Sequence, residues 1–465
     1  MSSFPYADEY GVISAMPEEG MPADEILDQL RATAALEDQR WEDGHCSGTM
    51  YCGDREHYAM VNEAFGYFSH VNTLQRDICP SMTRFEWEIV AMTLDILNGS
   101  AVAGHDPTHR ACGVITAGGT ESILTAMLGY RNLAQSQGIA APEMILPDTG
   151  HPAFLKASHL FGLKLVLAPT DPETTLVDVD FVRSAINTNT AVIVGSAGNY
   201  GYGTIDPISE LSDLAVEHGV GLHVDGCLGG WILPWGERLG YDIPTFDFRL
   251  PGVTSISADV HKYGYGPKGL SVLAWRDKSY RKHHYYVEAG WKGGLYVSAG
   301  LLGSRSGGIS AGSWAAMRSL GAQGYLERAK GIFESAFMMQ DAVKSHPELT
   351  ILGDPTFCFA FRSDEFDVYH VNDRMAGNGW RFNGLQNPPA LHFCVTGPQT
   401  QPGVVERFAT DLHDGVAYAR EAGDATPMTG SMYGGSGRPP GNADGELMAE
   451  LMAGYLDSVA DGPTD

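Results

Sequence analysis

The sequence predicts an α/β protein with a mainly parallel central sheet, helices on both of its faces, and a smaller C-terminal α+β domain. Between about residue 113 and residue 275, short apolar runs alternate with segments of helical periodicity. Such alternation is typical of βαβ units, which build parallel sheets that are covered on both faces. At 465 residues, the chain is also longer than one average domain.

The N-terminal part precedes this alternating pattern. Residues 1–22 are expected to form a loosely ordered arm, and a helix is expected from Ala23 to Gly44. Residues 45–80 are rich in Gly, Asn, Tyr and His, so they form either a long surface loop or one that builds a site. The apolar face of a second helix carries Phe85, Ile89, Met92 and Ile96.

The alternating region predicts the sheet and its helices. The expected strands are Met144–Leu146, Lys164–Ala168, Ala191–Ser196, Gly221–Asp225, Ser255–Ser257 and Ser271–Trp275. Helices are expected to begin near Thr120, Pro152, Asp178 and Pro207. After about residue 312, a long helix leads into strands near Leu349–Leu352 and Phe357–Arg362, and an amphipathic helix ends the chain.

Composition and charge limit the possible partners. The formal net charge is −27, which disfavours binding to nucleic acid or to an anionic membrane. The seven cysteines form no CxxC pair, as expected for reduced thiols in a cytoplasmic protein. No apolar run reaches the length of a membrane span, no secretory signal is recognisable, and no metal site is predicted.

The run Gly118-Gly119-Thr120 opens a predicted helix. Helix N-termini expose unpaired amides and a partial positive charge, so this run could bind a phosphate group. A tight turn followed by a helix cap explains the same residues at least as well.

Asp225 ends a predicted buried strand, where an unpaired carboxylate would be costly. A protonated pyridine nitrogen would be a suitable partner, because the ion pair keeps such a ring able to accept electrons. An aspartate that caps the following loop is an equally good explanation.

Lys262 lies in a loop rich in Gly and Tyr between two apolar strands. Partial burial lowers the pKa of a lysine and makes its amine a nucleophile for carbonyl groups. His261 and Ser257 could brace the phosphate of a cofactor. The alternative is a surface lysine, although such lysines seldom lie in an aromatic, glycine-rich loop.

In their order along the chain, these motifs resemble the sphingosine-1-phosphate lyase family. They comprise Gly-Gly-Thr-Glu-Ser, a helix-starting His, His-Val-Asp, and Ser-Ala-Asp-x-His-Lys-Tyr-Gly-Tyr-x-Pro-Lys-Gly. The resemblance extends roughly from Ser47 to the C-terminal helix. It implies a fold-type-I, group II decarboxylase-like enzyme that uses pyridoxal 5'-phosphate and forms a homodimer with shared sites.

The resemblance also implies roles for individual residues. Lys262 matches the lysine that binds the cofactor as a Schiff base, Asp225 the partner of the ring nitrogen, and His151 the histidine stacked on the ring. The cofactor-phosphate group would be held by Gly118, Gly119, Thr120, Ser257, His261 and, from a neighbouring subunit, Ser304. The substrate phosphate would be held by Lys268, Arg305 and Tyr51.

One segment departs from the pattern of the eukaryotic members. Where they usually have Asn-Pro-Leu-His-Pro-Asp, this chain has Asn-Thr-Leu-Gln-Arg-Asp at residues 72–77, which resembles the bacterial branch better. Either His70 or Gln75 could therefore face the substrate, and a structural role for His70 is as probable. Eukaryotic members also carry an N-terminal membrane anchor, which we do not find here.

The resemblance implies a retro-aldol cleavage of a phosphorylated long-chain base into a fatty aldehyde and ethanolamine phosphate. Lys262, Tyr51 and the site histidines are the candidate proton carriers. Two alternatives stay open: an amino-acid decarboxylase on the same scaffold, and a catalytically silent binding protein. We expect an N-terminal region over 1–110, a large cofactor-binding domain over 111–312 and a small domain over 313–465.

Overall fold

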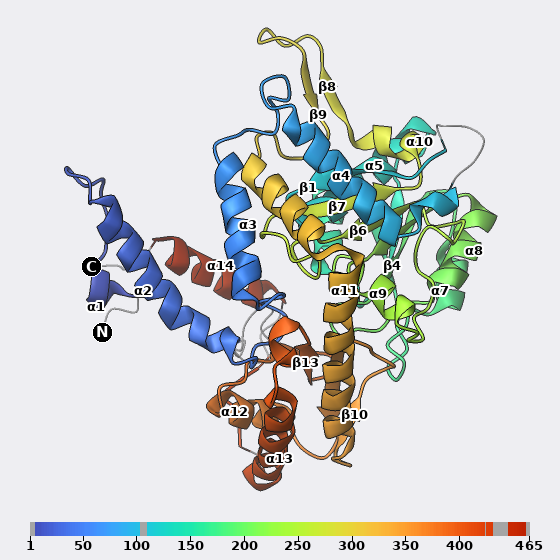
Figure 1. Ribbon diagram of the computed structural model, residues 1–465. Helices are drawn as coiled ribbons and strands as arrows, with labels where there is room; N and C mark the ends of the chain where they lie inside the picture. Colours follow the sequence, from blue (N-terminus) through green and yellow to red (C-terminus); the bar gives the residue numbers. More distant parts are fainter. Residues whose placement is uncertain (1–4, 103–108, 424, 431–444, 462–465) are drawn as a thin grey trace.

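The computed structural model describes residues 5–102, 109–423, 425–430 and 445–461 (Figure 1). Within these residues, the large sheet has seven strands in the order β1-β7-β6-β5-β4-β2-β3. Strands β2 to β6 pair in parallel, whereas β7 is antiparallel to both β6 and β1. The predicted α/β fold with a mainly parallel sheet is therefore confirmed.

The strands of the large sheet agree closely with the apolar runs. Their bounds are β1 Cys112–Thr116, β2 Glu143–Pro147, β3 Lys164–Ala168, β4 Thr190–Ser196, β5 Gly221–Asp225, β6 Ser255–Ala258 and β7 Ser271–Trp275. The sequence did not predict β1. This strand lies at the edge of the sheet and is only partly buried, so its apolar signal is weak.

Helices cover both faces of the large sheet. They are α5 Gly119–Ser136, α6 Pro152–Phe161, α7 Val179–Ala185, α8 Ile208–His218 and α9 Leu233–Arg238. Neighbouring residues of one strand enter different cores: Met144 and Leu146 pack with α5 and α6, whereas Ile145 packs with α7 and α8. Because β2 is buried on both faces, it is apolar at every position after Glu143.

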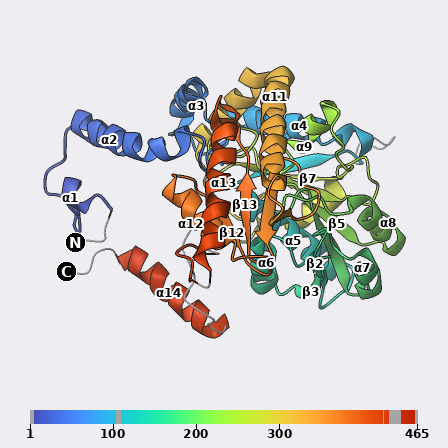
Figure 2. The same ribbon diagram turned by 90° about the horizontal axis from the view of Figure 1, so that it is seen from below.

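The N-terminal helices are α1 Ala7–Tyr10, α2 Ala23–Glu42, α3 Arg55–Phe68 and α4 Ser81–Ile96. The expectation of a loop over residues 45–80 was wrong for α3. Asp54 caps this helix by accepting hydrogen bonds from the amides of Glu56 and His57, and Val61 is buried. The apolar side chains of Ile26, Leu27 and Leu30 on α2 are exposed, and Figures 1 and 2 show α2 standing apart from the sheets.

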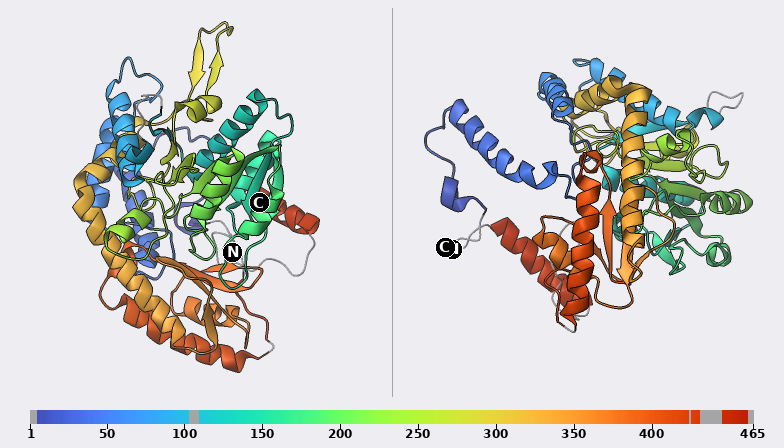
Figure 3. Two further views of the ribbon diagram at one scale, coloured as in Figure 1. Left: turned by 90° about the vertical axis from the view of Figure 1, so that its right-hand side faces the viewer. Right: turned by 60° about the horizontal axis from the view of Figure 1, so that its bottom comes forward.

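The long helix α11, Gly307–Lys344, links the two sheets, and Figure 3 shows it running past both. The small sheet has the order β10-β11-β13-β12, as part of the predicted smaller α+β region. Its strands are β10 Leu349–Ile351, β11 Cys358–Ser363, β12 Asn383–Leu385 and β13 Ala390–Cys394, and its helices are α12 Tyr369–Gly377 and α13 Val404–Ala422. The predicted boundary at residue 312 falls inside α11, and the domain limits stay a prediction.

The remaining described elements are short or peripheral. They are α10 Lys278–Arg281, β8 Tyr286–Glu288, β9 Tyr296–Ser298 and α14 Gly445–Asp461. The β8–β9 hairpin projects beyond the large sheet (Figure 1). None of the helices in these ranges is long and apolar enough to cross a membrane.

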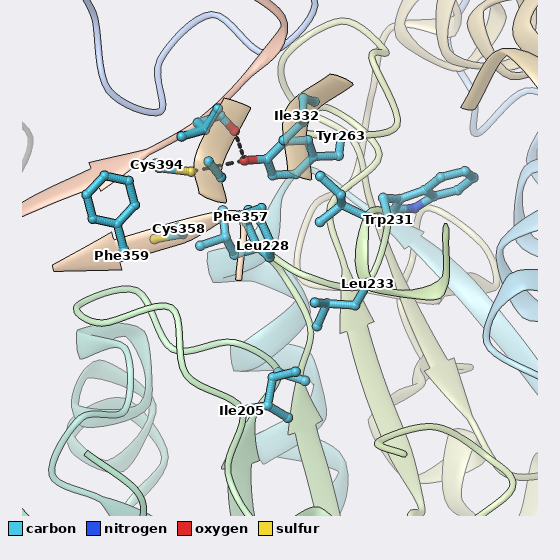
Figure 4. Packing of buried hydrophobic residues seen from close by; sticks show 14 of the residues in the cluster. Ile205, Leu228, Trp231, Leu233, Tyr263, Ile332, Phe357, Cys358, Phe359 and Cys394 are labelled. Carbon is cyan, nitrogen blue, oxygen red and sulfur yellow. Dashed lines mark hydrogen bonds between the residues drawn. The ribbon is translucent and has the colours of Figure 1, made fainter. Parts of the chain in front are cut away.

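The two sheets meet through buried aromatic and aliphatic side chains. The hydroxyl of Tyr263 donates to the carbonyl of Val395 over 2.7 Å and lies 3.1 Å from the sulfur of Cys394 (Figure 4). Phe357 packs edge-on against Tyr263 in the same cluster. The loop that carries Lys262 is therefore anchored to the small sheet by the residue that directly follows the lysine.

Candidate cofactor and substrate site

A pocket opens at the carboxyl ends of the large sheet's parallel strands, where ligands of such sheets bind. Ser196 and Asp225, the last residues of β4 and β5, line it. The structure also brings His151, Lys262, Lys268 and Tyr51 to this pocket, together with Arg381, Asn383, His392 and Cys394 from the small sheet's side. Most residues predicted for catalysis thus surround one cavity.

Asp225 is only 8% exposed, and hydrogen bonds from neighbouring residues hold its carboxylate in place. The oxygen Oδ1 accepts hydrogen bonds from the amide of Cys227 at 3.0 Å and from the hydroxyl of Ser257 at 3.2 Å. His223 lies behind Ser257, with its Nδ1 2.7 Å from the Ser255 hydroxyl. Burial lowers the pKa of His223 to about 4, so its ring is neutral at physiological pH.

Lys262 pairs with a buried carboxylate that the sequence analysis did not single out. Its ammonium group lies 3.0 Å from Asp259, which is 2% exposed on its side chain. Burial disfavours the charge of Lys262, but Asp259 outweighs it and raises the lysine pKa well above its ordinary value. Asp259 belongs to the same Ser-Ala-Asp-x-His-Lys motif, so its place in that motif was the available signal.

The start of α5 approaches this ion pair closely. A Cβ atom at Gly119 would lie 2.8 Å from the Asp259 carboxylate and 2.8 Å from the Cys227 sulfur, so only glycine fits. Gly118 has φ 132°, a conformation that favours glycine, and its Cβ would meet His261 at 3.4 Å. The amides at the start of this helix therefore lie beside the Lys262 loop.

His151 caps α6 with its side chain. The ring nitrogen Nδ1 accepts a hydrogen bond from the amide of Ala153 at 3.1 Å, so Nε2 carries the proton when the ring is neutral. Burial lowers the pKa of His151, and the nearby Asp225 carboxylate raises it less strongly. The side chain is consequently a neutral, proton-bearing wall of the pocket.

Tyr51 and Lys268 lie together at the mouth of the pocket. The Lys268 ammonium lies 4.5 Å from the centre of the Tyr51 ring and donates to the Thr49 carbonyl over 3.3 Å. Desolvation and the nearby charge of Lys262 lower the pKa of Lys268 to about 8. Burial raises the pKa of Tyr51, so its hydroxyl keeps its proton.

The sequence analysis missed the residues that the small sheet contributes. His392 stacks on Tyr200 with ring centres 4.8 Å apart, and Cys394 contacts Tyr263. Arg381 precedes β12 and donates to the hydroxyl of Thr49 over 3.4 Å. No short motif marks these residues, because they reach the pocket only when the two sheets pack together.

Other predicted residues lie outside the pocket lining. His70 and Thr120 are exposed, while Ser257 and His261 bond to Asp225 and to the Leu270 carbonyl, respectively. In this single chain, the Ser304 hydroxyl accepts from Asn72 over 2.9 Å, and Arg305 pairs with Glu86 over 2.8 Å. Gln75 is exposed and does not line the pocket either. The roles of these residues stay predictions.

The residues of this site fit pyridoxal phosphate, the cofactor that the motifs implied. The cofactor needs an amine, a carboxylate for its ring nitrogen and a seat for its phosphate. Lys262 and the buried Asp225 supply the first two at the same pocket. Gly118 and Gly119, at the start of α5 beside the Lys262 loop, supply the seat for the phosphate.

Comparisons with known proteins agree with this fit. The pyridoxal-dependent decarboxylase conserved domain matches residues 9–362. The sphingosine-1-phosphate lyase of Arabidopsis thaliana is 42% identical over 95% of this chain and 80% of its own length. The solved structure of a Burkholderia pseudomallei sphingosine-1-phosphate lyase is 60% identical, with TM-score 0.92, and covers 99% of this chain and 100% of its own.

A more distant neighbour shows the fold alone. The glutamate decarboxylase of Lactobacillus brevis superposes with TM-score 0.74 over 90% of this chain and 97% of its own, at 19% identity. Its similarity confirms the fold-type-I architecture and carries no argument about the reaction.

Proposed function

The chain belongs to the sphingosine-1-phosphate lyase family, within the pyridoxal-dependent decarboxylases, and we propose that it cleaves sphingosine 1-phosphate or a related phosphorylated long-chain base. The products are a long-chain aldehyde and ethanolamine phosphate. One observation carries the proposal: the pocket that Lys262 and Asp225 line is also lined by a second lysine, Lys268. A substrate amine and a substrate phosphate can therefore be bound by different residues of one cavity.

Pyridoxal phosphate is the cofactor, and when bound it accepts the electron pair that a breaking carbon–carbon bond leaves behind. Lys262 would hold it covalently, and the Asp225 carboxylate would keep a proton on its ring nitrogen. The amides of Gly118, Gly119 and Thr120 would hold its phosphate. His151 would cover its ring as a neutral side chain, so that it adds no positive charge there.

Protons at the reacting end are handled by a small set of groups. The proton on His151 Nε2 can be donated to a substrate oxygen, because Nδ1 is occupied by the Ala153 amide. The Tyr51 hydroxyl can also donate a hydrogen bond to the substrate, since its raised pKa keeps it protonated. Lys262 is therefore our candidate for carrying the proton that leaves the substrate hydroxyl, once its amine is released by the incoming substrate.

We also propose a homodimer with shared sites. In the chain described here, Ser304 and Arg305 bond to Asn72 and Glu86, and neither lines its own pocket. Both follow the exposed, apolar segment that includes Leu301 and Leu302. Such a segment is suited to contact a second copy, where Ser304 would reach the cofactor phosphate and Arg305 the substrate phosphate.

Product analysis of the purified holoenzyme tests the proposal. With sphingosine 1-phosphate we expect equal amounts of long-chain aldehyde and ethanolamine phosphate, and no carbon dioxide. Carbon dioxide from amino acids without aldehyde would instead identify an amino-acid decarboxylase. A protein that does not develop visible absorbance with added pyridoxal phosphate would be the catalytically silent alternative.

A further inference from the structure

Arg381 is held at the pocket by backbone contacts on both sides. Its amide donates to the carbonyl of His45 over 2.9 Å, and its own carbonyl accepts from the amide of Ser47 over 3.0 Å. These contacts fasten residues 45–49, which we call the strap, to the chain just before β12. The guanidinium group lines the pocket and donates to the hydroxyl of Thr49 over 3.4 Å.

Lys268 reaches the same residue of the strap from the opposite side. It belongs to the loop between β6 and β7 of the large sheet, and its ammonium donates to the carbonyl of Thr49 over 3.3 Å. Two cations from separate segments, the loop between β6 and β7 and the residues before β12, therefore converge on Thr49. This convergence stands out in a chain whose formal net charge is −27.

Of the described residues that line the pocket, Asp225 is the one carboxylate. Asp225 is bonded to Cys227 and Ser257, and Asp259 is paired with Lys262. Desolvation and the charge of Lys262 lower the pKa of Lys268, and the Asp259 carboxylate raises it less strongly. Two cations that line one pocket and meet at Thr49 favour binding of an anion, because both can donate charge-assisted hydrogen bonds to it.

We propose that Arg381 is a specificity-determining residue that binds the substrate phosphate together with Lys268. This inference rests on the proposed function and adds to it a residue that precedes the small sheet's strand β12 by two positions. A planar guanidinium can donate two parallel hydrogen bonds to a phosphate, whereas the ammonium of Lys268 acts as a point charge. The cofactor phosphate belongs elsewhere, at the start of α5, whose glycines contact Asp259 and His261.

Substitutions of Arg381 in the holoenzyme test this assignment. Arg381→Gln should raise KM for sphingosine 1-phosphate by roughly 10- to 100-fold, as expected when a charge-assisted hydrogen bond is lost, with kcat changed much less. The inhibition constant of inorganic phosphate should rise in parallel. Arg381→Lys, which keeps the charge without the fork, should fall between Arg381→Gln and the wild type.

Controls separate binding from folding. Arg374→Gln removes an exposed arginine of α12, which pairs with Asp414 over 3.9 Å outside the pocket, and should leave every constant unchanged. Cofactor affinity, cofactor absorbance and Tm of Arg381→Gln should equal those of the wild type. Altered cofactor binding or a lower Tm in both Arg381 variants would overturn the assignment in favour of a structural role.

The outcomes also separate this inference from the proposed function. Wild-type cleavage with unchanged KM and unchanged phosphate inhibition in Arg381→Gln would refute the role of Arg381 alone. If the wild type cleaves no phosphorylated long-chain base, the proposed function fails. Calorimetric binding of inorganic phosphate to the wild type but not to Arg381→Gln would then still support an anion site at Arg381, and equal binding would exclude it.

Discussion

The two ends of the pocket are built in different ways. The cofactor end consists of residues at the ends of β5 and β6, where Asp225 and Asp259 are almost fully buried and bonded to neighbours. The substrate end consists of the strap, one loop of the large sheet and one residue before β12. Charges that drive chemistry are thus fixed by the sheet, whereas recognition depends on how separate segments pack.

Two lysines of one loop show this contrast most directly. Lys262 lies beside a buried carboxylate, which overcomes the effect of burial and raises its pKa well above the ordinary value. Lys268 lies near the same loop's other end, where burial and the charge of Lys262 lower its pKa to about 8. The two pKa shifts differ because Lys262 forms an ion pair with Asp259, whereas for Lys268 desolvation and the charge of Lys262 outweigh the attraction of Asp259.

Lys262→Arg should have the largest effect and tests the cofactor end. We expect turnover to fall by at least about 10⁴-fold, because arginine cannot form the covalent link or shuttle the proton. Borohydride reduction should no longer attach the cofactor to the protein. Arginine is the better replacement than alanine, since it leaves a cation beside the buried Asp259 and so preserves the fold.

Lys268→Met is the matched control for Lys262→Arg, since it alters a lysine of the same loop that belongs to the substrate end of the pocket. It should retain reducible cofactor attachment. If Lys262→Arg kept substantial turnover, or if both variants lost cofactor attachment alike, the division of the pocket into two ends would be wrong.

Asp225→Asn should have the next largest effect. Asparagine keeps the shape of the side chain and an oxygen for the Cys227 amide and the Ser257 hydroxyl, but it removes the negative charge. We expect kcat to fall by roughly 10²- to 10⁴-fold, and cofactor affinity to weaken, while KM changes little. Stopped-flow turnover and cofactor titration measure the two quantities, and a variant impaired only in KM would contradict the assignment.

The same division explains what the sequence could predict. Asp225, Lys262 and the glycines at the start of α5 belong to short motifs, because each lies at the end of a strand of the large sheet or within about four residues of it. Arg381 and the strap come together only through the parallel bridge between Cys46 and Arg381, more than three hundred residues apart in sequence. Local patterns carry no signal for such a contact.

Local sequence patterns also failed to predict helix α3 and strand β1. The cap at Asp54 is visible in the sequence, but α3 has few buried residues of its own and packs mainly against α11. Strand β1 lies at the edge of the sheet beside β7, and its first three residues are only partly buried. Tertiary packing thus determined both elements more than local propensity did.

Lys268 is expected to give a smaller, pH-dependent effect. Its ammonium is charged below about pH 8 and neutral above it, so phosphate binding should weaken as the pH rises through this value. KM of the wild type should therefore rise between pH 7 and pH 9.

Two variants test whether Lys268 is the titrating group. In Lys268→Arg, whose side chain stays charged, the rise of KM with pH should disappear. Lys268→Met should show a KM raised roughly 10- to 100-fold at every pH. A pH-dependent rise that persists in Lys268→Arg would assign the titration to another group.

Substitution of Tyr51 should have the smallest effect on turnover. The result decides whether Tyr51 belongs to the cofactor end or to the substrate end of the pocket. Its ring supports the Lys268 ammonium, and its raised pKa keeps the hydroxyl protonated throughout the working pH range. Tyr51→Phe keeps the ring face, so we expect kcat to fall less than about tenfold, with an unchanged pH profile of kcat. Tyr51→Leu removes the ring and should raise KM several-fold through Lys268. A loss of about 10²-fold or more in Tyr51→Phe, together with loss of one limb of the pH profile, would instead make Tyr51 a proton carrier and place it with the cofactor end.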